Sequence, residues 1–207
     1  MNKIVYFLFI VAFGTVVTAQ TKMSSQEANA LKNKVKVTAD KTQSISSDFT
    51  QYKHLDFLSN DIESNGKLSF KAPNTVKWEY VKPFAYSVLF KGETLYINNE
   101  GDKSNVDIGS NKLFKELNTL IAASIKGDMF NEEYFTITYF KKDKNSEVHF
   151  APKDPKLSEF IKVFHITFTS NGDVLEVKMV EPSNDYTQII FSNRKVNKVI
   201  PDAVFAQ

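Results

Sequence analysis

Apolar and polar residues alternate along much of the chain, which is the pattern of β-strands with one buried and one solvated face. The alternation starts near Ile45 and is regular through residues 66–71, 76–80, 86–90 and 95–97. Turn signals separate these runs at intervals of about eight to twelve residues, so we predict an antiparallel meander. The apolar residues that the alternation places on one face include Leu68, Phe70, Val76, Trp78, Tyr80, Val88, Phe90 and Leu95.

Two stretches follow the helical period instead. Residues 24–43 begin with Ser24 and have Glu27 three positions later, which is the spacing of a capping box. Residues 111–125 are the second stretch, and Lys126-Gly127-Asp128 ends it. Each stretch has an apolar stripe of the kind that lies on a sheet: Ala28, Leu31, Val35 and Ala39 in the first, and Leu113, Leu117, Leu120, Ile121 and Ile125 in the second.

Strand-like alternation returns in the second half of the chain. The predicted strands there are 134–141, 147–150, 160–169, 174–180 and 186–191. Asn171-Gly172 is a two-residue hairpin signal between the third and fourth of them. We count about eleven strands and two or three helices, with no linker and no parallel βαβ rhythm. The predicted fold class is therefore α+β, mainly β, in one domain.

The N-terminus has the pattern of an export signal. Lys3 precedes 14 uncharged residues, 4–17, and small residues follow as far as Ala19. This run of 14 mostly apolar residues is shorter than the stretch of about 18 apolar residues that a membrane-spanning helix needs. We expect residues 1–19 to be a signal peptide cleaved between Ala19 and Gln20. Because no cysteine is available for acylation, we expect residues 20–207 to be exported without stable membrane insertion.

Composition and charge exclude several classes of partner. The absence of cysteine excludes disulfides, thiolate metal sites and cysteine nucleophiles. Without Lys3 the chain has 25 basic and 24 acidic residues, and Arg194 is its single arginine. This balance gives no reason to expect a nucleic-acid partner.

Candidate chemistry is sparse. The chain has no nucleophile elbow, Walker loop, dinucleotide fingerprint or H-E-x-x-H motif. His54, His149 and His165 each stand alone in a predicted strand, so we expect no metal site and no histidine-based catalysis. A hydrolase with carboxylates converging from distant strands stays open, although nothing points to it. We therefore expect neither an enzyme nor a cofactor.

Aromatic residues are abundant, with 18 phenylalanines and eight tyrosines. They either fill a core between sheet and helices, or line a cavity for an apolar ligand on the concave face of a strongly curved sheet. Periodicity alone does not separate these two interpretations.

Several segments, in chain order, resemble the LolA family of periplasmic lipoprotein carriers. GKLSFKAP at 66–73, VKWEY at 76–80 and GETLY at 92–96 are similar to the family's G-x-L-x-F-K-R-P strand, aromatic-W strand and D-G-K-T-L-W hairpin. The weaker matches are ISSDFTQ at 45–51, LIA at 120–122, FAPK at 150–153 and IPDAVF at 200–205, the last of which resembles the family's closing strand. Together they span nearly the whole chain after residue 19.

The resemblance implies a fold and a function. The fold is an incomplete antiparallel β-barrel of about eleven strands, with helices forming a lid over a hydrophobic cavity. The function is a monomeric periplasmic carrier that receives acylated lipoproteins from an ATP-driven extractor in the inner membrane and releases them to an unknown acceptor at the outer membrane. The acyl chains would contact Leu68, Phe70, Val76, Trp78, Tyr80, Val88, Phe90 and Leu95, and the lid would consist of Leu31, Val35, Leu117, Leu120 and Ile121.

One residue departs from the family pattern. Proteobacterial members have an arginine that tethers the lid where this chain has Ala72. Lys71 is adjacent, but alternation places it on the opposite face. We therefore expect a looser lid, held mainly by apolar contacts. Two other functions stay open: a carrier of another lipid or glycolipid, and a periplasmic domain that senses lipoproteins.

Overall fold

The computed structural model describes residues 21–107 and 129–206. The expected signal peptide, residues 1–19, and the expected second helix, residues 111–125, lie outside the described residues. Within the described part, no helix is both long and apolar enough to cross a lipid bilayer.

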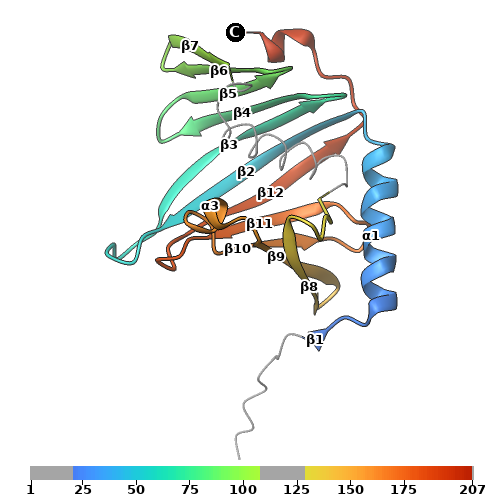
Figure 1. The fold of residues 1–207 in the computed structure, drawn as a ribbon. Coiled ribbons are helices and arrows are strands. Elements are labelled where there is room, and N and C mark those ends of the chain that lie inside the picture. The colour runs from blue at the N-terminus through green and yellow to red at the C-terminus, as the bar shows by residue number, and fades with distance from the viewer. Residues whose placement is uncertain (1–20, 108–128, 207) are drawn as a thin grey trace, which may run out of the picture.

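A single antiparallel sheet of twelve strands dominates the fold (Figure 1). Its strands in spatial order are β1 (Thr21–Lys22), β8 (Phe135–Lys142), β9 (Asn145–Pro152), β10 (Val163–Phe168), β11 (Val174–Val180), β12 (Tyr186–Val196), β2 (Ser44–His54), β3 (Ile62–Lys71), β4 (Thr75–Lys82), β5 (Tyr86–Lys91), β6 (Thr94–Asn99) and β7 (Asp102–Asp107). The sequence predicted about eleven strands, and β1 is too short for periodicity to indicate. The sheet is mostly antiparallel and unclosed, as predicted.

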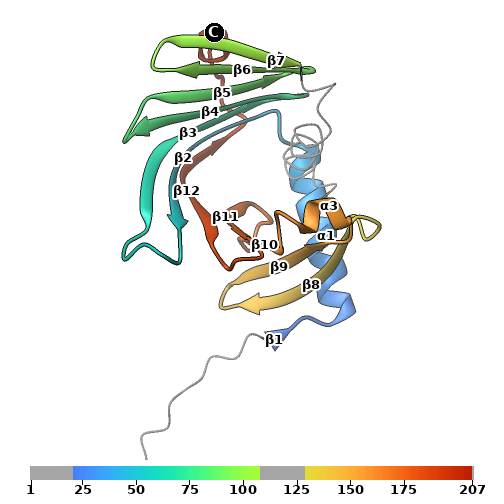
Figure 2. The ribbon, with the colours of Figure 1, turned by 60° about the vertical axis from the view of Figure 1, so that its left-hand side comes forward.

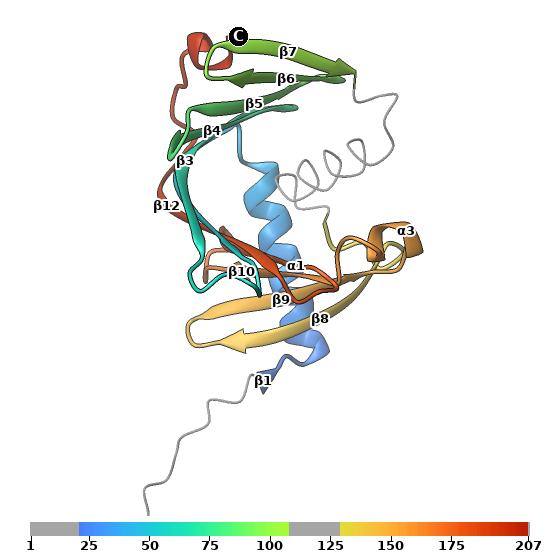
Figure 3. The ribbon, with the colours of Figure 1, turned by 90° about the vertical axis from the view of Figure 1, so that its left-hand side faces the viewer.

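Two meanders make up the sheet, and one long-range pair joins them. Strands β2 to β7 follow one another in space as in sequence, and so do β8 to β12. The pairing of β12 with β2, from Tyr186 opposite His54 to Val196 opposite Ile45, connects the two halves. The sheet curves strongly between its two edges, so that it has a concave side (Figures 2 and 3).

Helix α1 (Ser25–Asp40) lies on the concave side of the sheet (Figure 3). It starts at the predicted capping box, in which Ser24 accepts from the Glu27 backbone N–H while the Glu27 carboxylate accepts from Ser24. It ends at Asp40, three residues before the predicted end. Its buried residues pack on strands β8 to β10 in a cluster of Leu31, Val35, Met129, Phe135, Val148, Phe150, Ile166 and Phe168.

A second apolar cluster covers the concave face of the other meander. Its buried members are Ile45, Phe49, Leu68, Phe70, Val76, Phe90 and Leu95. Phe49 lies at its centre, where its ring packs edge-on against Trp78 and Tyr80 at centroid distances of 5.0 and 5.2 Å. Gly66 is opposite Phe49 in the β2–β3 ladder. A Cβ atom at Gly66 would lie 2.4 Å from the Phe49 ring, so only glycine fits beneath it.

Some predicted boundaries are wrong. Residues 160–169 are not one strand, because Asp154 caps a short helix, α3 (Pro155–Ser158), and β10 begins only at Val163. The β10–β11 connection is longer than the predicted two-residue turn: Thr169 bonds to Asp173 across it, and Gly172 takes a positive φ of 85°. The segment at 200–205, expected as a closing strand, contains a 3₁₀ helix, η1 (Asp202–Phe205).

Candidate functional site

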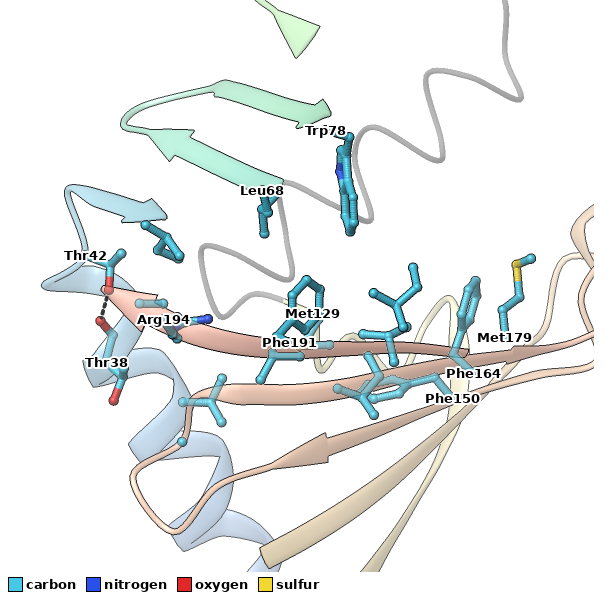
Figure 4. A pocket seen from close by; sticks show the side chains of 18 of the residues that line it. Thr38, Thr42, Leu68, Trp78, Met129, Phe150, Phe164, Met179, Phe191 and Arg194 are labelled. Carbon is cyan, nitrogen blue, oxygen red and sulfur yellow. Dashed lines mark hydrogen bonds between the residues drawn. The ribbon is translucent and has the colours of Figure 1, made fainter. Parts of the chain in front are cut away.

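A cavity of about 280 Å³ lies between α1 and the concave face of the sheet (Figure 4). It extends across the boundary between the two meanders, since both contribute side chains. Its lining residues are Val35, Thr38, Ala39, Thr42, Ile45, Leu68, Trp78, Met129, Phe135, Phe150, Phe164, Ile166, Gly172, Val174, Val177, Met179, Thr187, Ile189, Phe191 and Arg194.

The cavity wall is almost entirely apolar, and two of its three threonine hydroxyls donate to backbone carbonyls. The Thr42 hydroxyl donates to the Thr38 carbonyl at 2.7 Å, and the Thr38 hydroxyl donates to the Asn171 carbonyl at 3.0 Å. Both bonds also fix the C-terminal end of α1. Such a wall suits an aliphatic or aromatic ligand, because an apolar ligand leaves no buried polar group unpaired.

Arg194 is the exception in this wall. Its guanidinium Nη2 lies 3.3 Å from the Asp173 Oδ1, and its Nε is buried without a hydrogen-bond acceptor among the described residues. Burial lowers the pKa of Arg194, and the Asp173 carboxylate partly opposes this shift. The chain therefore keeps its single arginine in a wall that is otherwise apolar.

A β-bulge in β12 brings Arg194 into the cavity. Thr187, Ile189 and Phe191 line the cavity at every second position, as expected for one face of a strand. The register then shifts between Ser192 and Lys195, and Asn193 has a positive φ of 52°. Because a bulge inserts an extra residue, it returns Arg194 to the face that Phe191 occupies. Strict alternation would have placed Arg194 on the convex face.

The predicted acyl-chain-binding residues fall into two groups. Leu68 and Trp78 line the cavity. Phe70, Val76, Phe90 and Leu95 are buried in the second apolar cluster, and Tyr80 and Val88 pack against it. The Tyr80 hydroxyl donates to Gln51 at 3.0 Å, and burial raises the pKa of Tyr80.

The predicted lid residues are only partly described. Val35 lines the cavity and Leu31 packs beside it in the α1 cluster. Leu117, Leu120 and Ile121 lie outside the described residues. Ala72 packs against the second apolar cluster, and the Lys71 ammonium lies 2.5 Å from Asp202, on an exposed part of the surface.

Sequence reasoning missed the half of the wall that β10 to β12 supply. The signal was present, because Phe164 and Ile166, Val177 and Met179, and Ile189 and Phe191 are each two residues apart. Alternation marked these as strands but could not show that they face the same cavity as Leu68. That information depends on the β12–β2 pairing, which is long-range.

The histidines are not all isolated, contrary to the prediction. His149 and His165 are directly opposite each other on β9 and β10, and their rings stack at 3.8 Å. His149 Nε2 lies 2.8 Å from Glu147 Oε1. Burial, and next the neighbouring His149, lower the pKa of His165 to about 4. His165 alternates with the cavity-lining Phe164 and Ile166, so this cluster lies on the opposite face of the sheet.

Comparison with known proteins agrees with this architecture. The family model described as outer membrane lipoprotein carrier protein LolA matches residues 40–207. Curated relatives named outer-membrane lipoprotein carrier protein include one from Chromobacterium violaceum, 24% identical over 145 residues (70% of this chain and 68% of the relative). Another, from Dechloromonas aromatica, is 29% identical over 147 residues, or 69% of this chain and 66% of the relative. The matched region thus spans about two thirds of each relative's length.

A solved structure shares the fold. The crystal structure of MucB superposes with a TM-score of 0.54 at 10% identity, covering 89% of this chain and 64% of MucB. At this identity the likeness concerns the fold alone. Because the family model covers most of the sequence, the chain belongs to the LolA family, whose members are carrier proteins and not enzymes.

Proposed function

We propose that this protein binds the acyl chains of lipoproteins in the cavity and carries them across the periplasm from the inner to the outer membrane. The observation that supports this most directly is the apolar cavity between α1 and the curved sheet, in a chain that belongs to the LolA family. The names of its relatives supply the class of cargo.

The energetics explain why such cargo needs a carrier. Each methylene moved from water to an apolar site contributes about 0.8 kcal/mol, so a chain of about sixteen carbons represents roughly 12 kcal/mol. An acylated protein does not cross an aqueous compartment unaided against that cost. A carrier must bury the chain, and it must also release it.

Release follows from competition between ligand and protein for the same apolar surface. Ligand sites commonly have volumes of about 300–1,000 Å³. The cavity, at about 280 Å³, is just below this range. A whole acyl chain therefore requires the wall to open, and the free energy needed to separate its packed side chains weakens binding. We propose that the lid, with Leu31 and Val35 on α1 and with Leu117, Leu120 and Ile121, supplies the apolar surface that competes with the cargo.

The predicted acyl-chain-binding residues divide by role in this proposal. Leu68 and Trp78 would contact the chain directly. The six that do not line the cavity would support its wall, and would reach the chain only when the cavity widens: Phe70, Val76, Tyr80, Val88, Phe90 and Leu95.

The remaining parts of the proposal concern the cell. Residues 1–19 would direct export and be cleaved near Ala19. The protein would act as a monomer, receive cargo from an ATP-driven extractor in the inner membrane, and deliver it to an acceptor in the outer membrane.

Mass spectrometry of the material that co-purifies with the exported protein from its native envelope tests the proposal. We expect triacylated peptides. Recovery of free lipid or glycolipid alone would contradict lipoprotein transport and indicate a carrier of another lipid. Recovery of no lipid, from protein that also fails to bind added acyl chains, would reject the carrier function.

A further inference from the structure

Arg194 gives the cavity one polar end. Along β12 the lining residues run from Thr187, opposite Met179, through Ile189 and Phe191 to Arg194. Figure 4 shows Arg194 near Thr38 and Thr42 at one end, with Phe164 and Met179 at the other. A ligand that fills the cavity therefore has apolar neighbours along most of its length and a guanidinium at one end.

The hydrogen bonding of Arg194 is incomplete. The guanidinium has five N–H donors in a fixed fork. Its ion pair with Asp173, at 3.3 Å, occupies one side of the fork. The buried Nε–H has no acceptor among the described residues. An unpaired buried donor is destabilising, so a ligand that supplies an acceptor oxygen gains affinity once the Arg194 side chain turns its Nε–H toward the cavity.

The Asp173 carboxylate beside Arg194 determines which acceptor groups a ligand can place there. Asp173 already offsets the positive charge of Arg194, and its side chain is only 26% exposed. A carboxylate ligand at Nε would stand beside the Asp173 carboxylate and be repelled by it. A neutral carbonyl oxygen accepts the same hydrogen bond without this repulsion.

We propose that Arg194 donates from its Nε–H to the carbonyl oxygen of an acyl ester or amide, and thereby places the head of an acyl chain at this end of the cavity. This inference rests on the proposed carrier function. It gives the bound acyl chain one orientation in the cavity. The carbonyl lies at Arg194 and the methyl end points toward Met179 and Phe164. It also predicts that the cavity prefers esterified chains to free fatty acids.

Fluorescence of Trp78 provides the test, since Trp78 is the single tryptophan and lines the cavity. The full exported protein would be titrated with methyl palmitate, palmitate and hexadecane. We expect methyl palmitate to bind about tenfold more tightly than palmitate, because the palmitate carboxylate would be repelled by Asp173 whereas the ester carbonyl would not.

Two variants separate the roles of the pair. Arg194→Met keeps a long apolar stem and should lower affinity for methyl palmitate about tenfold, while affinity for hexadecane stays within a factor of about two. Asp173→Asn removes the repelling carboxylate and should reverse the preference, so that palmitate binds more tightly than its ester. Thermal unfolding of each variant checks that it is folded.

The outcomes distinguish this inference from the proposed function. If wild-type protein binds none of the three probes, the carrier function and this inference both fail. If all three bind but Arg194→Met leaves ester affinity unchanged, or weakens ester and hexadecane equally, the inference alone is overturned. If palmitate binds wild type as tightly as its ester, the charge argument is overturned.

A second inference comes from the convex face and is independent of the cavity. Glu147, His149 and His165 each offer one ligand atom, and these atoms lie within 4.8 Å of one another. Ligand atoms around a tetrahedral Zn²⁺ are about 3.3 Å apart, given metal–ligand distances of about 2.0–2.2 Å. The two imidazole rings are stacked and nearly parallel, with 13° between their planes, so at least one ring must turn before both nitrogens point at a single ion.

We infer that Glu147, His149 and His165 bind a divalent transition-metal ion, Zn²⁺ being the type that two histidines and a carboxylate suit best. The three ligands come from adjacent strands, so the ion would link β9 to β10. Lys142, 2.7 Å from the Glu147 Oε2, and Lys178, opposite His165, are the nearby cations that such an ion must outweigh.

Thermal unfolding of tag-free protein, with and without Zn²⁺, tests this site. We expect Zn²⁺ to raise the unfolding midpoint of wild type and of the control His54→Asn, whose histidine instead contacts Asp61. We expect no rise in His149→Asn or His165→Asn. Co²⁺ should give visible d–d bands in wild type and in neither of these two strand variants. Absence of a Zn²⁺ effect in wild type, or its retention in both strand variants, would overturn the inference.

Discussion

Gly66 illustrates how much one missing side chain determines in this sheet. Phe49 lies over it, and the rings of Trp78 and Tyr80 pack edge-on against Phe49. A Cβ at Gly66 would also lie 2.2 Å from the Glu79 carbonyl oxygen, which is backbone and has little freedom to move. Glycine at the start of the GKLSFKAP segment thus allows an aromatic cluster to form beside the cavity.

We expect Gly66→Ala to destabilise the protein by about 1–3 kcal/mol, because the added methyl displaces Phe49 or the β4 backbone. Urea unfolding followed by circular dichroism measures the loss. Lys67→Ala, at the neighbouring exposed position, is the control and should stay within about 0.5 kcal/mol of wild type. Equal stability of the two variants would contradict the packing argument.

At the scale of elements, polar contacts hold helix α1 to β8 and to two turns of the chain. Lys141 on β8 pairs with Glu27 at 2.6 Å, Lys32 pairs with Glu132 at 2.9 Å, and Lys34 donates to the Ser170 carbonyl at 2.9 Å. The helix that covers the cavity is therefore held by polar contacts at the surface and by Leu31 and Val35 inside.

The pH dependence of this attachment follows from Glu27. The hydrogen bond from Lys141, and then those from Ser24, lower the pKa of Glu27 from 4.5 to about 2. The stabilisation is thus present above pH 4.5 and disappears as the pH falls toward 2. We expect Glu27→Gln to be less stable than wild type at about pH 7, with the difference shrinking as the pH falls through this window and in high salt. Thermal unfolding at several pH values measures the difference in stability between the two proteins. A difference that does not change with pH would contradict the stabilising role of the Glu27 carboxylate.

A substitution at Ala72 tests how firmly the lid is held. We expect Ala72→Arg to slow the release of bound lipid by about tenfold, if a cation at this position latches the lid through one charge-assisted hydrogen bond. Stopped-flow Trp78 fluorescence measures release. Ala72→Met supplies similar bulk without charge and should release lipid at nearly the wild-type rate. Unchanged affinity and exchange in Ala72→Arg would reject the looser-lid hypothesis.

Sequence periodicity predicted most helices and strands correctly, but it could not predict which strands pair or which side chains meet. The capping box at Ser24, the stripe of Leu31 and Val35, and the alternation of β3 to β6 depend on residues close in the chain, so the sequence shows them directly. The bulge before Arg194 and the stacking of His149 on His165 depend on which strands pair. Alternation also gives only the face of a residue, so it could not distinguish Leu68, which lines the cavity, from Phe70, which is buried in the core beside it.

At the scale of the whole molecule, the cavity belongs to neither meander alone. Leu68 and Trp78 come from one, Phe164 and Val177 from the other, and Val35 from α1. A change that fills this space should affect ligand binding while the two apolar clusters keep the fold stable.

We expect Val177→Phe to reduce the affinity for acyl chains by about tenfold or more, because the larger ring occupies part of a cavity of about 280 Å³. Trp78 fluorescence measures binding, and thermal unfolding verifies the fold. Val37→Phe makes the same substitution on the exposed face of α1, where Val37 is 50% exposed, and should bind as wild type does. If Val177→Phe binds normally, acyl chains occupy another site.

The pairing of β12 with β2 also sets the order in which the molecule can be built. Ser47 on β2 donates to the Ser192 carbonyl on β12, 145 residues later in the chain. Until that late strand arrives, β2 is an open sheet edge, and the cavity lacks the wall that Ile189, Phe191 and Arg194 provide. A chain that lacks β12, whether ribosome-bound or partly translocated, thus has an incomplete cavity wall. The cavity wall is therefore complete only after β12 has paired with β2, and the side of the membrane on which they pair determines which ligands the finished cavity can meet.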